Sequence, residues 1–191
     1  MMCGRYVLFS DSEAQDIRDI IDAVQRKVNG KLKTGEIFPT DKVPVLIQEN
    51  GVLVPEAVKW GFPGFQGKGV IINARSETAQ EKPMFRRSLQ ISRCLIPSCG
   101  FFEWTHAGQK VKYQFNLPES SSLYMAGLTG EFAGEQRFVI LTAPANTSMA
   151  EVHSRMPVVL TLPEIEQWMS SYQEAIKILQ RERPQLIKKP A

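Results

Sequence analysis

The sequence predicts an α+β fold in which a bent, barrel-like mixed β-sheet is flanked by helices. Short segments rich in β-branched and aromatic residues follow one another through the middle of the chain, with turn residues between them. The two longer amphipathic helical patterns occur near the two ends. The regular alternation of strands and helices that is typical of nucleotide-binding folds is absent. Because the 191 residues contain no repeat and no linker, we expect residues 1–191 to form a single domain.

The first helix is expected between residues 11 and 28. Ile17, Ile20, Ile21 and Val24 recur there at helical spacing with charged residues between them, and Asn29-Gly30 would end the helix. The other expected elements are strands at residues 43–48, 52–58, 70–73, 93–96, 113–116, 122–129 and 137–142, short helices or helical turns at 76–80, 84–88 and 146–152, a longer helix at 163–181 and a loosely held tail at 182–191.

Composition and charge narrow the class of protein. No apolar run approaches the roughly 18 residues of a membrane span, and the start lacks the layout of a secretory signal, so we expect a cytoplasmic protein without a membrane partner. Cys94 and Cys99 lack the spacing and histidine partners of a zinc site, so we interpret both as structural and expect no metal. The net charge of +3 permits an anionic partner, and any contact with nucleic acid should be local.

Cys3 has the most distinctive chemistry in the chain. It follows Met1-Met2, and removal of these methionines would leave a 1,2-aminothiol at the N-terminus. An aldehyde condenses with such an amine to an imine, and the thiol then attacks the same carbon to close a five-membered thiazolidine. The ordinary pKa is about 7.7–8.0 for an α-amine and about 8.5 for a thiol, so both unprotonated forms are accessible near neutral pH without a cofactor. A cysteine near a start codon is usually incidental, so the other motifs of the sequence determine whether Cys3 is interpreted as functional.

Four dispersed segments supply those motifs. They are Cys3-Gly4-Arg5-Tyr6, Ile71-Ile72-Asn73-Ala74-Arg75-Ser76-Glu77-Thr78, Gly100-Phe101-Phe102-Glu103-Trp104 and Val152-His153-Ser154-Arg155-Met156-Pro157-Val158-Val159-Leu160. In this order they resemble the SOS-response-associated peptidase family, whose members share CGR, NARxE, GF(Y/F)EW and HxRMP motifs. The resemblance runs from Cys3 to about Trp168.

The resemblance implies a function. Members of this family shield abasic sites in single-stranded DNA through a covalent thiazolidine between the N-terminal cysteine and the ring-opened deoxyribose. It therefore implies that Cys3 forms the crosslink, that single-stranded DNA with abasic sites is the partner, and that the protein associates with the nucleoid when it engages DNA. Asn73 would orient the amine or a sugar hydroxyl, because an amide donates and accepts hydrogen bonds without titrating.

Opening the sugar ring and forming the imine both require proton transfer, so an acid or base must be positioned. Glu103 is flanked by three aromatic residues, an apolar setting that raises the pKa of a carboxyl group. His153 can exchange protons near pH 7 and precedes a bend stiffened by Pro157. A solvent-facing glutamate and an ordinary core or surface histidine are the alternatives, and the matched motifs favour the catalytic interpretation.

The expected DNA contacts follow from residue types. Arg5 and Arg75 are suited to bind phosphates on either side of the lesion. Trp60, and with less support Phe62, could stack on flanking bases, although Trp60 beside a glycine fits a protein core equally well. Arg86, within Met84-Phe85-Arg86-Arg87, is a candidate for a second edge of the DNA site.

The chain also departs from the family pattern. Met1-Met2 should block ordinary methionine removal unless Met2 is the true start. Glu36-Ile37-Phe38-Pro39 stands where the family commonly has Asn-Val-Ala-Pro, so a polar contact near the site is expected to differ. Two other functions stay open: a cysteine peptidase or amidase that uses Cys3, Glu103 and His153, and a non-covalent binder of modified or single-stranded DNA.

Overall fold

Five strands close into a barrel in the computed structural model, which describes residues 4–9, 13–28, 32–105 and 108–191. The strands are β3 (Lys42–Glu49), β4 (Val52–Trp60), β8 (Arg93–Ser98), β11 (Leu123–Phe132) and β12 (Glu135–Pro144). Around the barrel, β12 pairs with β4, β4 with β3, β3 with β8, β8 with β11, and β11 with β12 again. Only the β12–β4 pairing is parallel among these five, so the predicted mixed, barrel-like sheet is confirmed.

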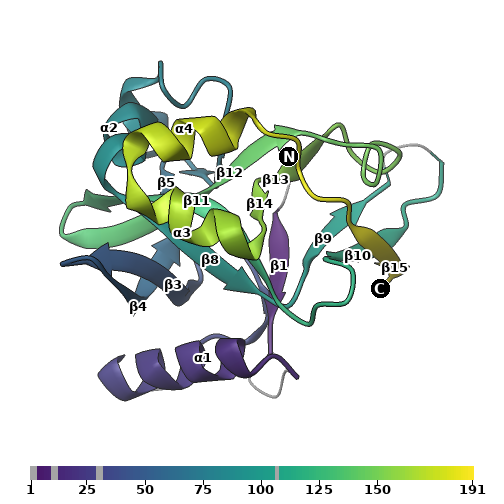
Figure 1. The fold of residues 1–191 in the computed structure, drawn as a ribbon, viewed down its shortest axis with the longest axis horizontal. Helices are drawn as coiled ribbons and strands as arrows, with labels where there is room; N and C mark the ends of the chain where they lie inside the picture. Colours follow the sequence, from purple (N-terminus) through teal and green to yellow (C-terminus); the bar gives the residue numbers. More distant parts are fainter. Residues whose placement is uncertain (1–3, 10–12, 29–31, 106–107) are drawn as a thin grey trace.

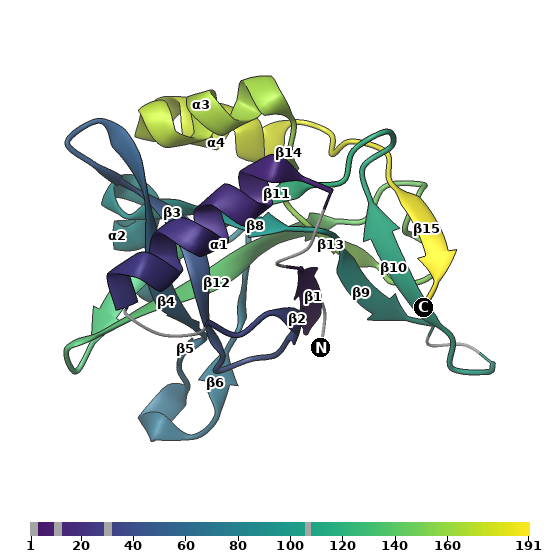
Figure 2. The ribbon, with the colours of Figure 1, turned by 90° about the horizontal axis from the view of Figure 1, so that it is seen from below.

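Helices cover two sides of the barrel (Figures 1 and 2). Helix α1 (Gln15–Val28) crosses one side and buries Ile17, Ile21 and Val24, in agreement with the predicted apolar spacing. Helices α2 (Pro83–Ile91), α3 (Leu162–Ser170) and α4 (Tyr172–Gln180) lie together on another side. Residues 11 and 12 and the predicted helix end at Asn29-Gly30 lie outside the described residues.

The longer helix expected at residues 163–181 is divided in two. Ser171 has an extended backbone, and its hydroxyl accepts a hydrogen bond from the Glu174 amide, which begins α4. The periodicity continues across this break because both helices bury apolar residues against the barrel. Residues 76–80 and 146–152 form turns, and the segment expected at 84–88 belongs to the longer α2.

Alternating residues on the barrel strands face two different clusters. On β12, Phe138 and Ile140 join one cluster, whereas Val139 and Leu141 join another. The second cluster contains residues of α2, α3 and α4 and therefore lies outside the barrel, so the first set faces the inside. This period of two residues is the pattern that made the strands predictable.

A second sheet extends from the barrel and carries the N-terminal strand. Its order is β15 (Ile187–Pro190), β10 (Lys112–Asn116), β9 (Phe101–Trp104), β1 (Arg5–Leu8) and β2 (Gly35–Ile37). The prediction of a loose tail at 182–191 is wrong, because β15 pairs with β10 and Arg183 is buried, donating to carbonyl oxygens of Ile178 and Arg181.

Short strands bring the motifs to the barrel. They are β5 (Phe62–Pro63), β6 (Val70–Ile71), β7 (Asn73–Arg75), β13 (Arg155–Pro157) and β14 (Val159–Leu160), with a 3₁₀ turn at Phe65–Gly67. Strand β7 pairs in parallel with β12, and β13 pairs with the end of the same strand. The helices of the described residues include none that is long and apolar enough to cross a membrane.

Candidate functional site

Strand β12 brings two of the motifs to one cleft. Thr142 of β12 is in register with Arg75 of β7 and with Pro157 of β13, so the two motifs lie on opposite sides of β12. A cleft of about 400 Å³ lies here, lined by Asn73, Arg75, Thr142, His153 and Arg155 together with apolar residues of β6. Three of the predicted site residues, Asn73, Arg75 and His153, are therefore brought together.

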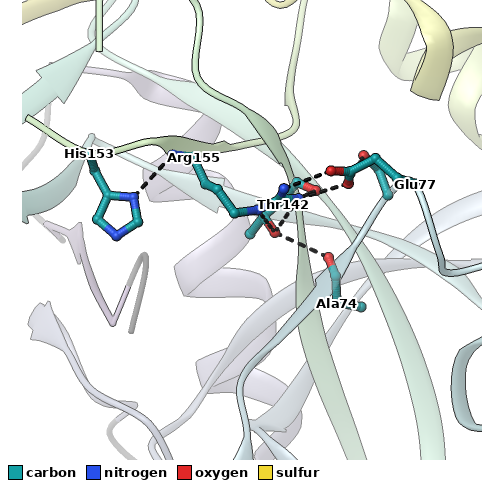
Figure 3. Close-up of polar contacts among 6 residues, drawn as sticks. Ala74, Glu77, Thr142, His153 and Arg155 are labelled. Carbon is teal, nitrogen blue, oxygen red and sulfur yellow. Dashed lines mark hydrogen bonds and ion pairs between the residues drawn. The ribbon is translucent and has the colours of Figure 1, made fainter. Parts of the chain in front are cut away.

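Arg155 is fixed by a network of hydrogen bonds (Figure 3). Its guanidinium donates to both carboxylate oxygens of Glu77, at 2.6 and 2.7 Å, and to the Thr142 carbonyl at 2.7 Å. The Arg155 side chain is only 17% exposed, and its hydrogen bonds lower the pKa of Glu77 to about 2. Glu77, Thr142 and Arg155 were not predicted as site residues, although Glu77 and Arg155 lie within the quoted motifs.

The same segment determines which ring nitrogen of His153 carries the proton in the neutral form. Its ring nitrogen Nδ1 accepts a hydrogen bond of 3.0 Å from the backbone N–H of Arg155. This bond requires an unprotonated Nδ1, so the neutral ring carries its proton on Nε2. His153 is thus arranged as a donor through Nε2.

Glu103 lies on the strand next to the N-terminal strand. Its side chain is buried, with 3% of the residue exposed, and it pairs with Tyr113 of β10. Strands β1 and β9 pair Arg5 with Phe102, and the same antiparallel register continued by one residue leads to Gly4 and Glu103. Glu103 therefore neighbours the residue that follows Cys3, and Cys3 itself lies outside the described residues.

The prediction that Trp60 stacks on DNA bases is wrong. Trp60 is completely buried, contacts the rings of Tyr6 and Phe138, and donates from its indole to the carbonyl of Ile72 at 3.0 Å. On β4, Trp60 is one of the residues that point into the barrel, and its position beside a glycine does not show which face of the strand it occupies. Trp60 instead connects β1 to the residue before Asn73.

Phe62 is also unsuited to base stacking, because it is fully buried against Phe85 and Phe132. Its strand nevertheless leads to an aromatic residue that is 83% exposed, Phe65, on the turn that joins β5 to β6. The turn requires Gly64, since a Cβ there would lie 2.0 Å from the Lys68 carbonyl oxygen. The glycines on either side of Phe65 in the sequence, Gly64 and Gly67, could have indicated an exposed aromatic residue on a turn.

The three arginines that were predicted to contact DNA have different settings. Arg75 is exposed at the cleft and makes no ion pair with the described residues. Arg5 is paired with Glu36 and lies between the rings of Phe38 and Trp104. Arg86 is exposed on α2, a helix that contributes no described residue to the cleft.

The structure also describes the two later cysteines and the side chain types that bind metals. Cys94 and Cys99 are both buried, as expected of structural cysteines, and burial raises the pKa of the Cys94 thiol. Across the ranges that the structure describes, no three His, Cys, Asp or Glu side chains are grouped to hold a metal ion.

Known proteins resemble this chain in sequence and in fold. The chain is 31% identical over 182 residues to the abasic site processing protein YoaM of Bacillus subtilis (strain 168), covering 88% of this chain and 79% of YoaM. It is 32% identical over 187 residues to YoqW of the same organism, another abasic site processing protein, covering 88% and 80%. A crystal structure of a protein from Bacteroides thetaiotaomicron has the same fold, with a TM-score of 0.78 at 22% identity, over 98% of this chain and 91% of that one. Residues 2–188 match the model of the family described as SOS response associated peptidase (SRAP), and the chain belongs to this family.

Proposed function

We propose that this protein processes abasic sites in single-stranded DNA by forming a covalent thiazolidine between Cys3 and the opened sugar, which shields the lesion. The strongest support is the register of β1 and β9, which leads to Glu103 beside Gly4, the residue after Cys3. The related proteins named abasic site processing proteins support the same substrate.

The proposed reaction has two bond-forming steps. The free α-amine of Cys3 attacks the C1′ aldehyde of the opened sugar, and the condensation releases one water and gives an imine. The Cys3 sulfur then attacks the imine carbon, and the thiol proton is transferred to the nitrogen as the five-membered ring closes. No oxidant, reductant or cofactor is consumed.

Two residues are proposed to move or hold protons in these steps. His153 donates a hydrogen bond from Nε2 to the sugar ring oxygen as the ring opens, since its Nδ1 is occupied by the Arg155 amide. Buried Glu103 transfers protons at the amine and the departing water. Asn73, on the cleft wall, orients the amine or a sugar hydroxyl.

The DNA strand is proposed to run along the cleft. Exposed Arg75 binds a phosphate, and Arg86 belongs to a second edge farther along the strand. Phe65 takes the base-stacking role first expected of Trp60, because it is exposed next to a cleft strand.

Phe65→Ala should weaken binding of an undamaged single strand about fivefold with an unchanged melting temperature, and unaltered affinity would remove Phe65 from the site.

A denaturing gel tests the proposed function. Protein whose intact mass shows Cys3 as the first residue should shift an oligonucleotide that carries one abasic site and leave an undamaged strand unshifted. If native gels show binding but the denaturing gel shows no adduct, the protein is a non-covalent binder.

The peptidase alternative requires a base for the Cys3 thiol. His153 does not suit that role, because its Nδ1 accepts from the Arg155 amide and its Nε2 carries the proton.

A further inference from the structure

Arg5 and Lys112 share a single carboxylate at the N-terminal edge of the second sheet. Oxygen Oε1 of Glu36 accepts from Arg5 Nη1 at 3.2 Å and from Lys112 Nζ at 3.1 Å. The Arg5 guanidinium also lies 4.7 Å from the Phe38 ring centre and 4.8 Å from the Trp104 ring centre. We call Arg5, Glu36, Phe38, Trp104 and Lys112 the Arg5 cluster.

The strand registers explain why these side chains meet. Arg5 pairs with Phe102 on β9, Trp104 lies two residues further along β9, and Lys112 pairs with Trp104 from β10. Alternation along a strand puts these side chains on one face of the sheet and Glu103 on the other. The cluster is thus a separate surface, carried by the strands that position Glu103.

The Arg5 cluster is accessible to solvent, and Glu36 offsets part of its positive charge. The Arg5 side chain is 40% exposed, Glu36 is 30% exposed and Lys112 is 25% exposed, so a ligand can reach all three. Two cations and one carboxylate leave a local charge of about one, where Arg5 and Lys112 alone would provide two. A DNA phosphate that approaches Arg5 or Lys112 must therefore compete with Glu36.

We infer that Glu36 is a specificity-determining residue that lowers the affinity of the Arg5 cluster for single-stranded DNA, whether damaged or undamaged. The inference rests on the proposed function, because it requires a DNA strand to pass the N-terminal edge. Ordinary DNA is held only by such non-covalent contacts, whereas an abasic strand is also captured by Cys3. Lower affinity for every strand therefore favours the damaged one.

Glu36 could also be needed to hold Arg5 in place, which would make its removal weaken binding. Two ring faces hold the guanidinium independently of the carboxylate, and Lys112 lies 3.8 Å from the Phe102 ring centre. Both cations keep these contacts when Glu36 is neutralised, so the gain in charge should prevail.

The test compares Glu36→Gln with Glu56→Gln. Glu56 pairs with Lys27 and is 35% exposed, so its variant loses the same charge from a similarly exposed ion pair elsewhere on the protein. Binding of a fluorescent undamaged oligothymidylate is measured by anisotropy at several salt concentrations. Glu36→Gln should bind roughly three- to tenfold more tightly, with a slope of log affinity against log salt that is steeper by about 0.7. Glu56→Gln should match the wild type.

Further measurements separate the possible failures. Arg5→Gln in the Glu36→Gln background should abolish most of the gain, and the gain should shrink at high salt, which a change in folding would not produce. Unchanged or weaker binding by Glu36→Gln, or an equal gain by Glu56→Gln, would overturn the inference while the wild type still crosslinks. A wild type that neither binds nor crosslinks single strands would instead refute the proposed function.

Discussion

Two arginine–glutamate pairs flank the proposed path of the DNA, and they are built differently. Arg155 binds Glu77 through two short hydrogen bonds, also donates to the Thr142 carbonyl, and is 17% exposed. Arg5 makes a single 3.2 Å contact with Glu36, which it shares with Lys112, and is 40% exposed between aromatic rings. The first pair holds the backbone that orients His153, whereas the second leaves its cation accessible. Under the proposed function, the geometry beside the reacting sugar is therefore fixed, whereas the charge of the surface that binds DNA can be adjusted.

The largest expected effect lies at Glu103, which is on β9 of the sheet that also contains Arg5 but points to the other face. Glu103→Gln should slow crosslinking by roughly 10²–10⁴-fold at saturating DNA and leave affinity unchanged, the usual cost of losing a general acid or base. Single-turnover rates on denaturing gels provide the measurement. A wild-type rate would reduce Glu103 to a structural role and transfer the proton chemistry to His153.

The two arginines can be compared directly with the same substitution. Arg155→Lys cannot keep both hydrogen bonds to Glu77, so it should slow crosslinking about tenfold to a hundredfold through a displaced His153. Arg5→Lys should keep the rate and alter only affinity.

Nitrogen-15 NMR supplies the second measurement of this comparison. The wild-type His153 ring should show the Nε2–H tautomer, and Arg155→Lys should lose this single state. Equal effects of the two substitutions on rate and tautomer would contradict the proposed difference between the pairs.

Much of this fold was predictable because its signals are local. The barrel strands show a period of two residues, as in Phe138 and Ile140 against Val139 and Leu141. Strands β1 and β9 were missed, since three of the four residues in each are buried and the period of two residues is absent. The site was predictable only as separate motifs, because Asn73 and Arg155 meet through the pairing of β12 with β7, which is distant in sequence. For the same reason, the sequence did not predict that Arg5 pairs with Glu36, 31 residues away, or that Trp60 points into the core.

Arg75 tests whether an exposed arginine at the cleft binds phosphate. Arg75→Ala should flatten the dependence of log affinity on log salt by about 0.7, the contribution of one phosphate contact on a single strand. The loss of affinity should be similar for all flanking sequences. A loss confined to one sequence, with an unchanged slope, would show that Arg75 reads a base or supports the fold.

The smallest effect concerns the acid stability of the Arg155–Glu77 pair. The pKa of Glu77 is about 2 in the folded protein, below its ordinary value of 4.5. The pair therefore contributes stability that is fully present above about pH 4.5 and is lost as the pH falls towards about 2. Because the Glu77 side chain is 43% exposed, this contribution should stay below about 1 kcal/mol. Melting temperatures of Glu77→Gln should fall less steeply than those of the wild type in this window, and parallel curves would refute the assignment.

The covalent step at Cys3 is the central claim, and one measurement tests it most directly. Wild-type protein with Cys3 at its N-terminus should form an adduct with abasic single-stranded DNA that survives denaturation without borohydride. Cys3→Ser keeps the amine but cannot close the thiazolidine, so it should leave only a reversible imine that borohydride must trap. An unreduced Cys3→Ser adduct as stable as that of the wild type would contradict the proposed function.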